Sequence, residues 1–250
     1  MIDTHAHLDA CADRPSALIR RARSAGVERI VTVGTGIESC RAALELADRH
    51  EEVFAALGID PHQAGDAEAN RVDELRELAE HDRAVAVGET GLDYFRDLAP
   101  RDRQRRLFEA QLELAAELGK PVVIHTRDAD ADTAAVLAGF DGTVVMHCFS
   151  SPGLLETVLE RGYYVSFAGN VTYPKASDLR AAVAQVSNER ILVETDSPYL
   201  APQARRGRPN EPANVLHTLA ALAEARGDEV AALGRQIDRN ADVAFRLPAP

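Results

Sequence analysis

The stretch Asp3-Thr4-His5-Ala6-His7-Leu8 decides how the rest of the chain is interpreted. In an extended strand, side chains two residues apart project from the same face, so His5 and His7 point together. Two neutral imidazoles at a strand end can coordinate one divalent metal ion together. A single pair of this kind also occurs as core histidines bonded to the backbone, so other ligands have to come from elsewhere in the chain. Asp3 shares their parity and is a candidate to orient His5.

Eight short β-rich runs are spaced along the chain, and the first of them contains these histidines. Several runs are continuously apolar, as in strands that are buried on both faces. A turn and a helical pattern follow each run, which implies parallel strands joined by helices. One such helix is predicted at 101–119, where Gly119 provides a stop. The predicted strands are 2–8, 29–34, 53–60, 84–89, 121–127, 143–149, 163–168 and 191–195.

The fold class predicted from this alternation is α/β, as a single domain over residues 1–250 that forms a (β/α)8 TIM barrel. An open doubly wound sheet is the alternative. Two features favour closure: the strand count equals that of the barrel, and no GxGxxG sequence follows the first strand. The unusual polar residues also gather at the carboxyl ends of several strands, where barrel enzymes place their chemistry.

Composition limits the class of protein further. The formal net charge is −12, from 28 basic and 40 acidic residues, which argues against a broad nucleic-acid-binding surface. Bound metal ions can still supply local positive charge in a cleft. The three cysteines are widely spaced and predict no disulfide framework. We see no signal peptide, no apolar stretch long enough to span a bilayer, and no obligate protein partner, so a cytoplasmic protein is expected.

Further candidate ligands stand at the ends of four other predicted strands. Glu89 ends the fourth strand, His125 lies near the end of the fifth, His147 near the end of the sixth, and Asp196 directly after the eighth. Each alone is also explained as a satisfied core residue. Cys148 alternates to the face opposite His147, so we do not count it as a ligand.

Together these residues predict a catalytic metal site. Core histidines placed by chance would not all gather at one end of the barrel, whereas sites are built there. A buried carboxylate such as Glu89 is costly unless paired or bound to metal, and its two oxygens can bridge two ions. Asp196 can hold a metal and take a proton from the attacking water. Histidine and carboxylate ligands without a thiolate suit two catalytic ions of Mg²⁺, Mn²⁺ or Zn²⁺.

At this point the motifs resemble those of the TatD family of metal-dependent deoxyribonucleases, which are amidohydrolase-type barrels. The resemblance spans nearly the whole chain in the right order. It rests on DTHAHLD at 3–9, GIDPH at 58–62, GETGLD at 88–93, VVIHTR at 122–127, MHCFS at 146–150, ETDSPYLAP at 194–202, RGRPNEP at 206–212 and NADVAF at 240–245.

The resemblance implies a role for each ligand. His5 and His7 would bind one ion, Glu89 would bridge, and His125 and His147 would bind the second ion. Asp196 would hold the first ion and act as general base. The resemblance also implies the activity of an Mg²⁺-dependent exonuclease that shortens DNA, often single-stranded, in DNA catabolism.

Five residues are predicted to contact the substrate. His62 is a candidate to donate to a phosphate or to act as an acid. Guanidinium groups fit phosphate well, and the loop after the eighth strand is a common phosphate site in barrels. The other four are Arg127, Arg205, Arg208 and Asn210.

Two positions depart from the motifs of the family. The third-strand motif usually reads GxHPH, and here Asp60 stands in place of the first histidine. The sixth-strand motif usually reads HCFSG, and Ser151-Pro152 replaces the glycine. The first change puts the role of that histidine in question, and the second is expected to alter the loop.

The sequence therefore predicts a metal-dependent hydrolase, most simply an exonuclease on single-stranded DNA. One alternative is a deacylase, esterase or amidase on the same metal centre, for example an aminoacyl-tRNA deacylase, because an activated water attacks carbonyl carbon as readily as phosphorus. Another is a non-catalytic interaction protein, against which the complete set of ligands argues.

Overall fold

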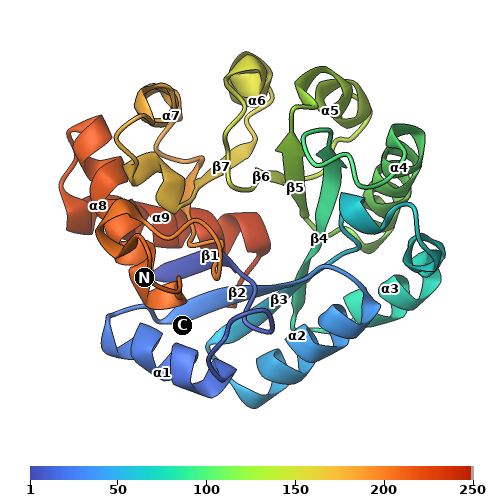
Figure 1. Ribbon diagram of the computed structural model, residues 1–250, viewed down its shortest axis with the longest axis horizontal. Coiled ribbons are helices and arrows are strands. Elements are labelled where there is room, and N and C mark those ends of the chain that lie inside the picture. The colour runs from blue at the N-terminus through green and yellow to red at the C-terminus, as the bar shows by residue number, and fades with distance from the viewer. Residues whose placement is uncertain (249–250) are drawn as a thin grey trace.

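A computed structural model describes residues 1–248 of the chain. Eight parallel strands form one sheet in sequential order, β1 to β8, with helices around the outside (Figure 1). This confirms the predicted barrel. The strands are β1 (Ile2–Ala6), β2 (Arg29–Gly34), β3 (Val53–Leu57), β4 (Ala84–Asp93), β5 (Val122–Arg127), β6 (Val144–Met146), β7 (Tyr164–Phe167) and β8 (Ile191–Val193).

Nine α-helices connect and cover these strands within residues 1–248. The first helix begins at Pro15, and the predicted stop at Gly119, which has a φ of 62°, is confirmed. The helices are α1 (Pro15–Ser24), α2 (Ile37–Arg49), α3 (Val72–Ala79), α4 (Arg101–Leu118), α5 (Asp130–Leu137), α6 (Leu155–Glu160), α7 (Ser177–Gln185), α8 (Val215–Arg226) and α9 (Val230–Phe245).

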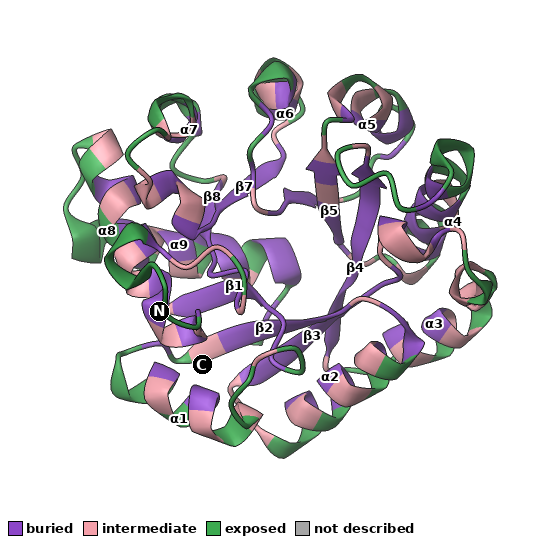
Figure 2. Cartoon of the chain, in the orientation of Figure 1, coloured by how far each residue is buried: buried purple, intermediate pink, exposed green. Residues whose placement is uncertain are grey.

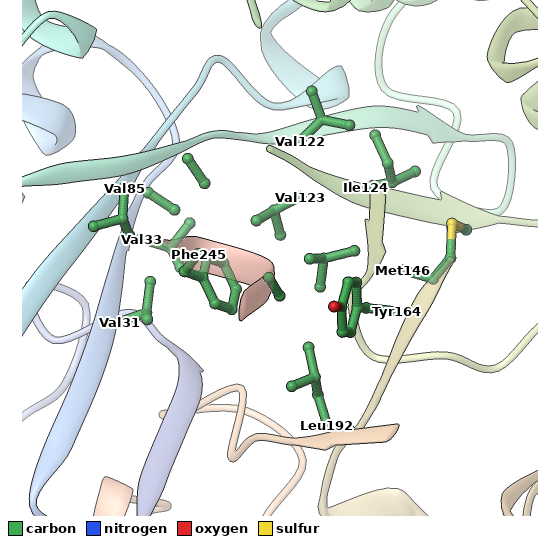
Figure 3. Close-up of a cluster of buried hydrophobic side chains, with 14 of the residues drawn as sticks. Val31, Val33, Val85, Val122, Val123, Ile124, Met146, Tyr164, Leu192 and Phe245 are labelled. Carbon is green, nitrogen blue, oxygen red and sulfur yellow. The ribbon is translucent and has the colours of Figure 1, made fainter. Parts of the chain in front are cut away.

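The core fills the interior of the barrel and the space between strands and helices. Figure 2 shows the strands mostly buried, with intermediate residues in β2 and β5, whereas the helices expose their outer faces. Inside the barrel, Phe245 of α9 lies near Val31 of β2, Val85 of β4 and Val123 of β5 (Figure 3). The apolar runs of the sequence are therefore strands buried on both faces, as parallel barrels require.

The barrel closes where the chain that follows β8 meets the end of β1. The amide of His7 donates to the carbonyl of Ser197 over 2.7 Å, and the amide of Asp196 donates to the carbonyl of His5 over 2.9 Å. A parallel bridge pairs Ala6 with Ser197. We call this junction the seam. It lies at the carboxyl ends of the strands, so closure of the fold and placement of the predicted ligands depend on the same few residues.

Several strand bounds differ from the prediction. The fourth strand was expected to end at Glu89, but β4 runs to Asp93, with a register shift against β5 between Val87 and Thr90. The Gly-rich sequence suggests a turn. In the structure a glycine is needed at position 91, because the backbone of Gly91 packs against the carbonyl of His125. By contrast β6 ends at Met146, before Cys148, whose φ of 45° interrupts the extended backbone.

Within residues 1–248, no helix has the length and apolar character needed to cross a membrane.

Candidate metal centre

A cavity of about 660 Å³ opens at the carboxyl ends of the strands. Most of the predicted ligands line it, so the structure brings together residues that lie far apart in the sequence. The histidine and carboxylate residues around it are His7, Asp9, Asp60, His62, Glu89, Asp93, His125, His147 and Asp196.

The first group of donors gathers at the seam. His5 and His7 project from the end of β1, and their Nε2 atoms are 3.2 Å apart. Oδ1 of Asp196 lies 3.4 Å from Nε2 of His7 and 3.9 Å from Nε2 of His5. Donors around one ion are separated by roughly 3–4 Å when each bond is near 2.1 Å. These three residues therefore have the spacing of ligands to a common ion.

Glu89 stands between this group and a second one. Its Oε2 lies 3.5 Å from Nε2 of His5 and 3.6 Å from Nε2 of His7. Its Oε1 lies 3.2 Å from Nε2 of His147 and 2.8 Å from Nδ1 of His125. The two oxygens face opposite sides, which is the placement that a bridging carboxylate needs.

His147 is held from behind by Glu194. Nδ1 of His147 lies 3.0 Å from Oε1 of Glu194, a side chain that is fully buried. A carboxylate in this place fixes the ring and its tautomer, and it leaves Nε2 facing Glu89. Glu194 therefore supports the ring of His147.

The chemistry of the donors fits bound cations. Nδ1 of His5 is buried without a hydrogen-bond partner among residues 1–248, whereas its Nε2 faces His7, Glu89 and Asp196. Burial lowers the pKa of His5 to about 4, which keeps this ring neutral. A neutral imidazole beside two carboxylates and further imidazoles is a metal-binding arrangement. The buried clusters are consistent with a binuclear site.

Without an ion, several of these imidazoles hold protons. Burial acts to lower the pKa of His125, but its contacts with Asp93 and Glu89 outweigh burial and raise it to about 9. Burial also acts to lower the pKa of His147. The nearby carboxylates of Glu89 and Glu194 outweigh burial, so this pKa lies well above the ordinary value. Burial acts to raise the pKa of Glu89, but His147 and His125 hold it well below the usual range.

Metal affinity should consequently depend on pH. A cation binds the neutral ring, and His125 loses its proton only as the pH approaches about 9. We expect affinity for Zn²⁺ to rise between about pH 6 and 8 by roughly tenfold per unit for each proton displaced. Calorimetric titration in two buffers of different ionisation enthalpy measures both the affinity and the released protons. Affinity independent of pH, with no proton release, would contradict this expectation.

Two carboxylates that were not among the predicted site residues, Asp60 and Asp93, lie beside His62. Nδ1 of His62 lies 3.1 Å from Oδ2 of Asp60, and its Nε2 lies 3.1 Å from Oδ2 of Asp93. Both nitrogens of His62 thus already face carboxylates, and neither is free to donate to a phosphate in this arrangement. The GETGLD run did contain Asp93, but only the extension of β4 shows that its side chain reaches His62 and His125.

The predicted substrate contacts are divided between two places. Arg127 lines the cavity, with its guanidinium 3.8 Å from the ring centroid of the exposed Phe95, and Arg96 lines the cavity as well. Arg205 and Arg208 instead line a separate hollow of about 310 Å³. They remain predicted substrate contacts without a place in the main cavity.

Asn210 has a structural role. It is buried, and its amide donates to the carbonyl of Thr195 over 2.9 Å and to the carbonyl of Tyr199 over 2.5 Å. These bonds hold the segment that carries Asp196. The expected contact of Asn210 with substrate therefore gives way to a positioning role, because no donor of its amide faces the cavity.

Two smaller expectations also change. Asp3 was expected to orient the ring of His5, but its carboxylate accepts from the amide and the hydroxyl of Thr195, over 2.9 and 2.6 Å, and so ties β1 to the chain after β8. Cys148 lines the cavity, because β6 has ended before it and strand alternation no longer decides its direction. Its amide donates to Glu194 over 2.8 Å.

Comparisons with known proteins show the family of the chain. Residues 2–246 match the family model described as TatD related DNase. The "Uncharacterized metal-dependent hydrolase TatD" of Mycobacterium tuberculosis is 41% identical, over 92% of this chain and 93% of that one. The "3'-5' ssDNA/RNA exonuclease TatD" of Erwinia billingiae is 38% identical, over 93% of each. The crystal structure of YJJV, a TatD homolog from Escherichia coli, superposes with a TM-score of 0.93 at 32% identity, over 99% of this chain and 98% of that one.

The barrel and its histidine–carboxylate cavity define the class of metal-dependent hydrolases with the amidohydrolase fold. Within this class, the chain belongs to the TatD family. Six of the motifs on which the resemblance rested contribute residues to the cavity. The motif at 206–212 instead contributes to the separate hollow, and the motif at 240–245 belongs to α9.

Proposed function

We propose that this protein is an exonuclease that hydrolyses phosphodiester bonds of single-stranded DNA with two divalent cations, most simply Mg²⁺. The observation that carries the proposal is the position of Glu89, whose oxygens face donor groups on both sides within one open cavity. The name of the Erwinia billingiae relative, an exonuclease for single-stranded DNA and RNA, supports the substrate class.

The chain's own residues account for substrate binding. Arg96 and Arg127 line the cavity, and guanidinium groups bind phosphate oxygens in pairs. The cavity has the volume of a small-ligand pocket, which suits the end of a strand better than the body of a duplex. A net charge of −12 also disfavours long stretches of duplex, because it leaves no broad basic surface.

Proton transfer is assigned to Asp196. Two bound cations would lower the pKa of the attacking water and neutralise charge that develops on the phosphate. Asp196 lies at the edge of the cavity, 8% exposed, so its carboxylate can both hold an ion and accept the proton of the water. Glu89 fixes the distance between the two donor groups, and Glu194 prevents His147 from turning away.

The test uses metal-free protein and single-stranded DNA labelled at one end. Stepwise shortening that needs Mg²⁺ or Mn²⁺ and is lost in Asp196→Asn supports the proposal. Intact DNA under every cation contradicts it and directs the search to ester and amide substrates, including aminoacyl-tRNA. If the metal-loaded protein is inert toward all of these, a non-catalytic interaction protein is the remaining interpretation.

A further inference from the structure

The permanent positive charge around the cavity is confined to one side. Among residues 1–248, the only arginine or lysine residues that line the cavity are Arg96 and Arg127. Arg96 lies in the segment after β4, and Arg127 ends β5, which pairs with β4. Guanidinium groups attract a phosphodiester chain, so a strand whose end occupies the cavity should leave it past β4 and β5. The carboxylates in the lining are those of Asp9, Asp60, Glu89, Asp93 and Asp196.

An exposed aromatic ring stands on this side. Phe95 is 60% exposed, and the guanidinium of Arg127 lies 3.8 Å from the centroid of its ring. Phe95 does not itself line the cavity, whereas Arg127 does, so the ring lies just outside the wall that Arg127 forms. Single exposed apolar residues are common on protein surfaces, so exposure alone indicates no site. The position of Phe95 beside the exit for the phosphodiester chain is what points to a ligand.

The backbone on either side of Phe95 is held in place. The amide of Tyr94 donates to the carbonyl of Arg127 over 2.9 Å, which joins this segment to β5. The amide of Arg96 donates to Oδ1 of the buried Asp93 over 2.7 Å. The backbone that carries the ring is therefore fixed before a ligand arrives, and a fixed surface loses less conformational entropy on binding.

The neighbouring tyrosines are placed differently. The guanidinium of Arg101 lies 4.2 Å from the ring centroid of Tyr94, which is only partly exposed. Tyr199 lines the cavity itself, with its ring edge-on to that of His7 and 5.8 Å between the centroids. Phe95 differs from both because it combines an exposed ring with a position outside the cavity wall.

We propose that Phe95 is the platform on which the base of the second nucleotide of a single-stranded DNA substrate stacks, while Arg127 binds the phosphate before it. The inference rests on the proposed function, because it takes the first nucleotide to occupy the cavity. Arg127 covers one face of the ring and leaves the other for the base. Every base has a π-face, so such a platform accepts any sequence. In a duplex the neighbouring bases cover these faces, so the contact selects an unpaired strand.

Binding of a fluorescent single-stranded DNA hexanucleotide to metal-loaded protein tests the platform, with fluorescence anisotropy as the readout. Phosphorothioate linkages protect the probe from hydrolysis. A second probe lacks the base at the second position from each end, so the direction of cleavage does not have to be known. We expect the wild type to bind the second probe at least about fivefold more weakly than the first. In Phe95→Leu, which keeps an apolar side chain but removes the flat ring, the two probes should bind equally.

Two further variants serve as controls. Phe95→Tyr keeps the ring and should retain the preference for the probe with all its bases. Leu98→Ala changes another exposed apolar residue of the same segment, 64% exposed, and should retain it as well. A distortion of the site would weaken both probes alike and leave their ratio unchanged, so the ratio measures stacking. Equal binding of the two probes by the wild type, or an undiminished preference in Phe95→Leu, would overturn the proposal.

The binding assay separates this inference from the exonuclease proposal. If unmodified DNA stays intact with every cation while the preference depends on Phe95, the exonuclease proposal fails and the platform for a single strand stands. If DNA is shortened but the preference is absent, the platform alone fails. A wild type that binds neither probe would overturn the platform as well.

Discussion

Asp196→Asn is expected to reduce the turnover of metal-dependent hydrolysis by about a thousandfold or more. The substitution removes a charged ligand beside His5 and His7 and also the base that accepts a proton from water. Asp196 has a φ of 54°, a left-handed conformation that asparagine tolerates, so the backbone should stay in place. Single-turnover rates with saturating cation measure the loss of the chemical step apart from binding.

The matched control for this variant is Asp102→Asn. Asp102 lies on α4, is 69% exposed, and makes only a surface ion pair with Arg106. Its substitution should leave the rate within about twofold, since exposed pairs contribute little. Elemental analysis should show weaker binding of one ion in Asp196→Asn alone. Wild-type turnover in that variant would remove Asp196 from the chemistry.

The second large effect is expected from Gly91→Ala. Gly91 has a φ of 140°, and a Cβ placed there would lie 2.0 Å from the carbonyl oxygen of His125. Both the strain and the clash must be relieved by moving β4 away from β5, at a cost of about 3 kcal/mol or more. For a chain of this size, that corresponds to a fall in Tm of roughly 6–12 °C.

Gly139→Ala is the control for the glycine substitution. No atom lies within 4 Å of a Cβ built at Gly139, and its φ is outside the left-handed region. Thermal unfolding of the two variants, followed by circular dichroism, should separate them clearly. Equal Tm values for both variants would show that the contact between β4 and β5 adapts to the extra methyl group.

The fold was predictable because its signal is local and repeated. Each buried strand reads as a short apolar run, and some helices carry their own start or stop, such as Pro15 for α1 and Gly119 for α4. The ends of the strands were less predictable. Gly88 and Gly91 suggest a turn in the sequence, whereas in the structure they allow β4 to pass close to its neighbours.

The part of the candidate site that consists of single polar residues at strand ends was predictable from the sequence. His5, His7, Glu89, His147 and Asp196 are conspicuous because each polar residue interrupts or ends an apolar run. The contacts of Asp93 with two histidines arise between strands, so no pattern within one strand contains them. The same holds for Asn210, whose polar side chain in a loop suggested a ligand contact but is used to support Thr195 and Tyr199.

A metal ion bound at the seam would also affect how the fold opens. His7 and Asp196 are about 190 residues apart in the sequence, yet they approach within 3.4 Å. An ion held by both acts as a tether across the two ends of the sheet, and it closes a loop that spans most of the chain. A permanent crosslink over such a loop restricts the unfolded chain by about 5 kcal/mol in the chain-entropy treatment. Opening of the barrel and release of the ion would then become a single event.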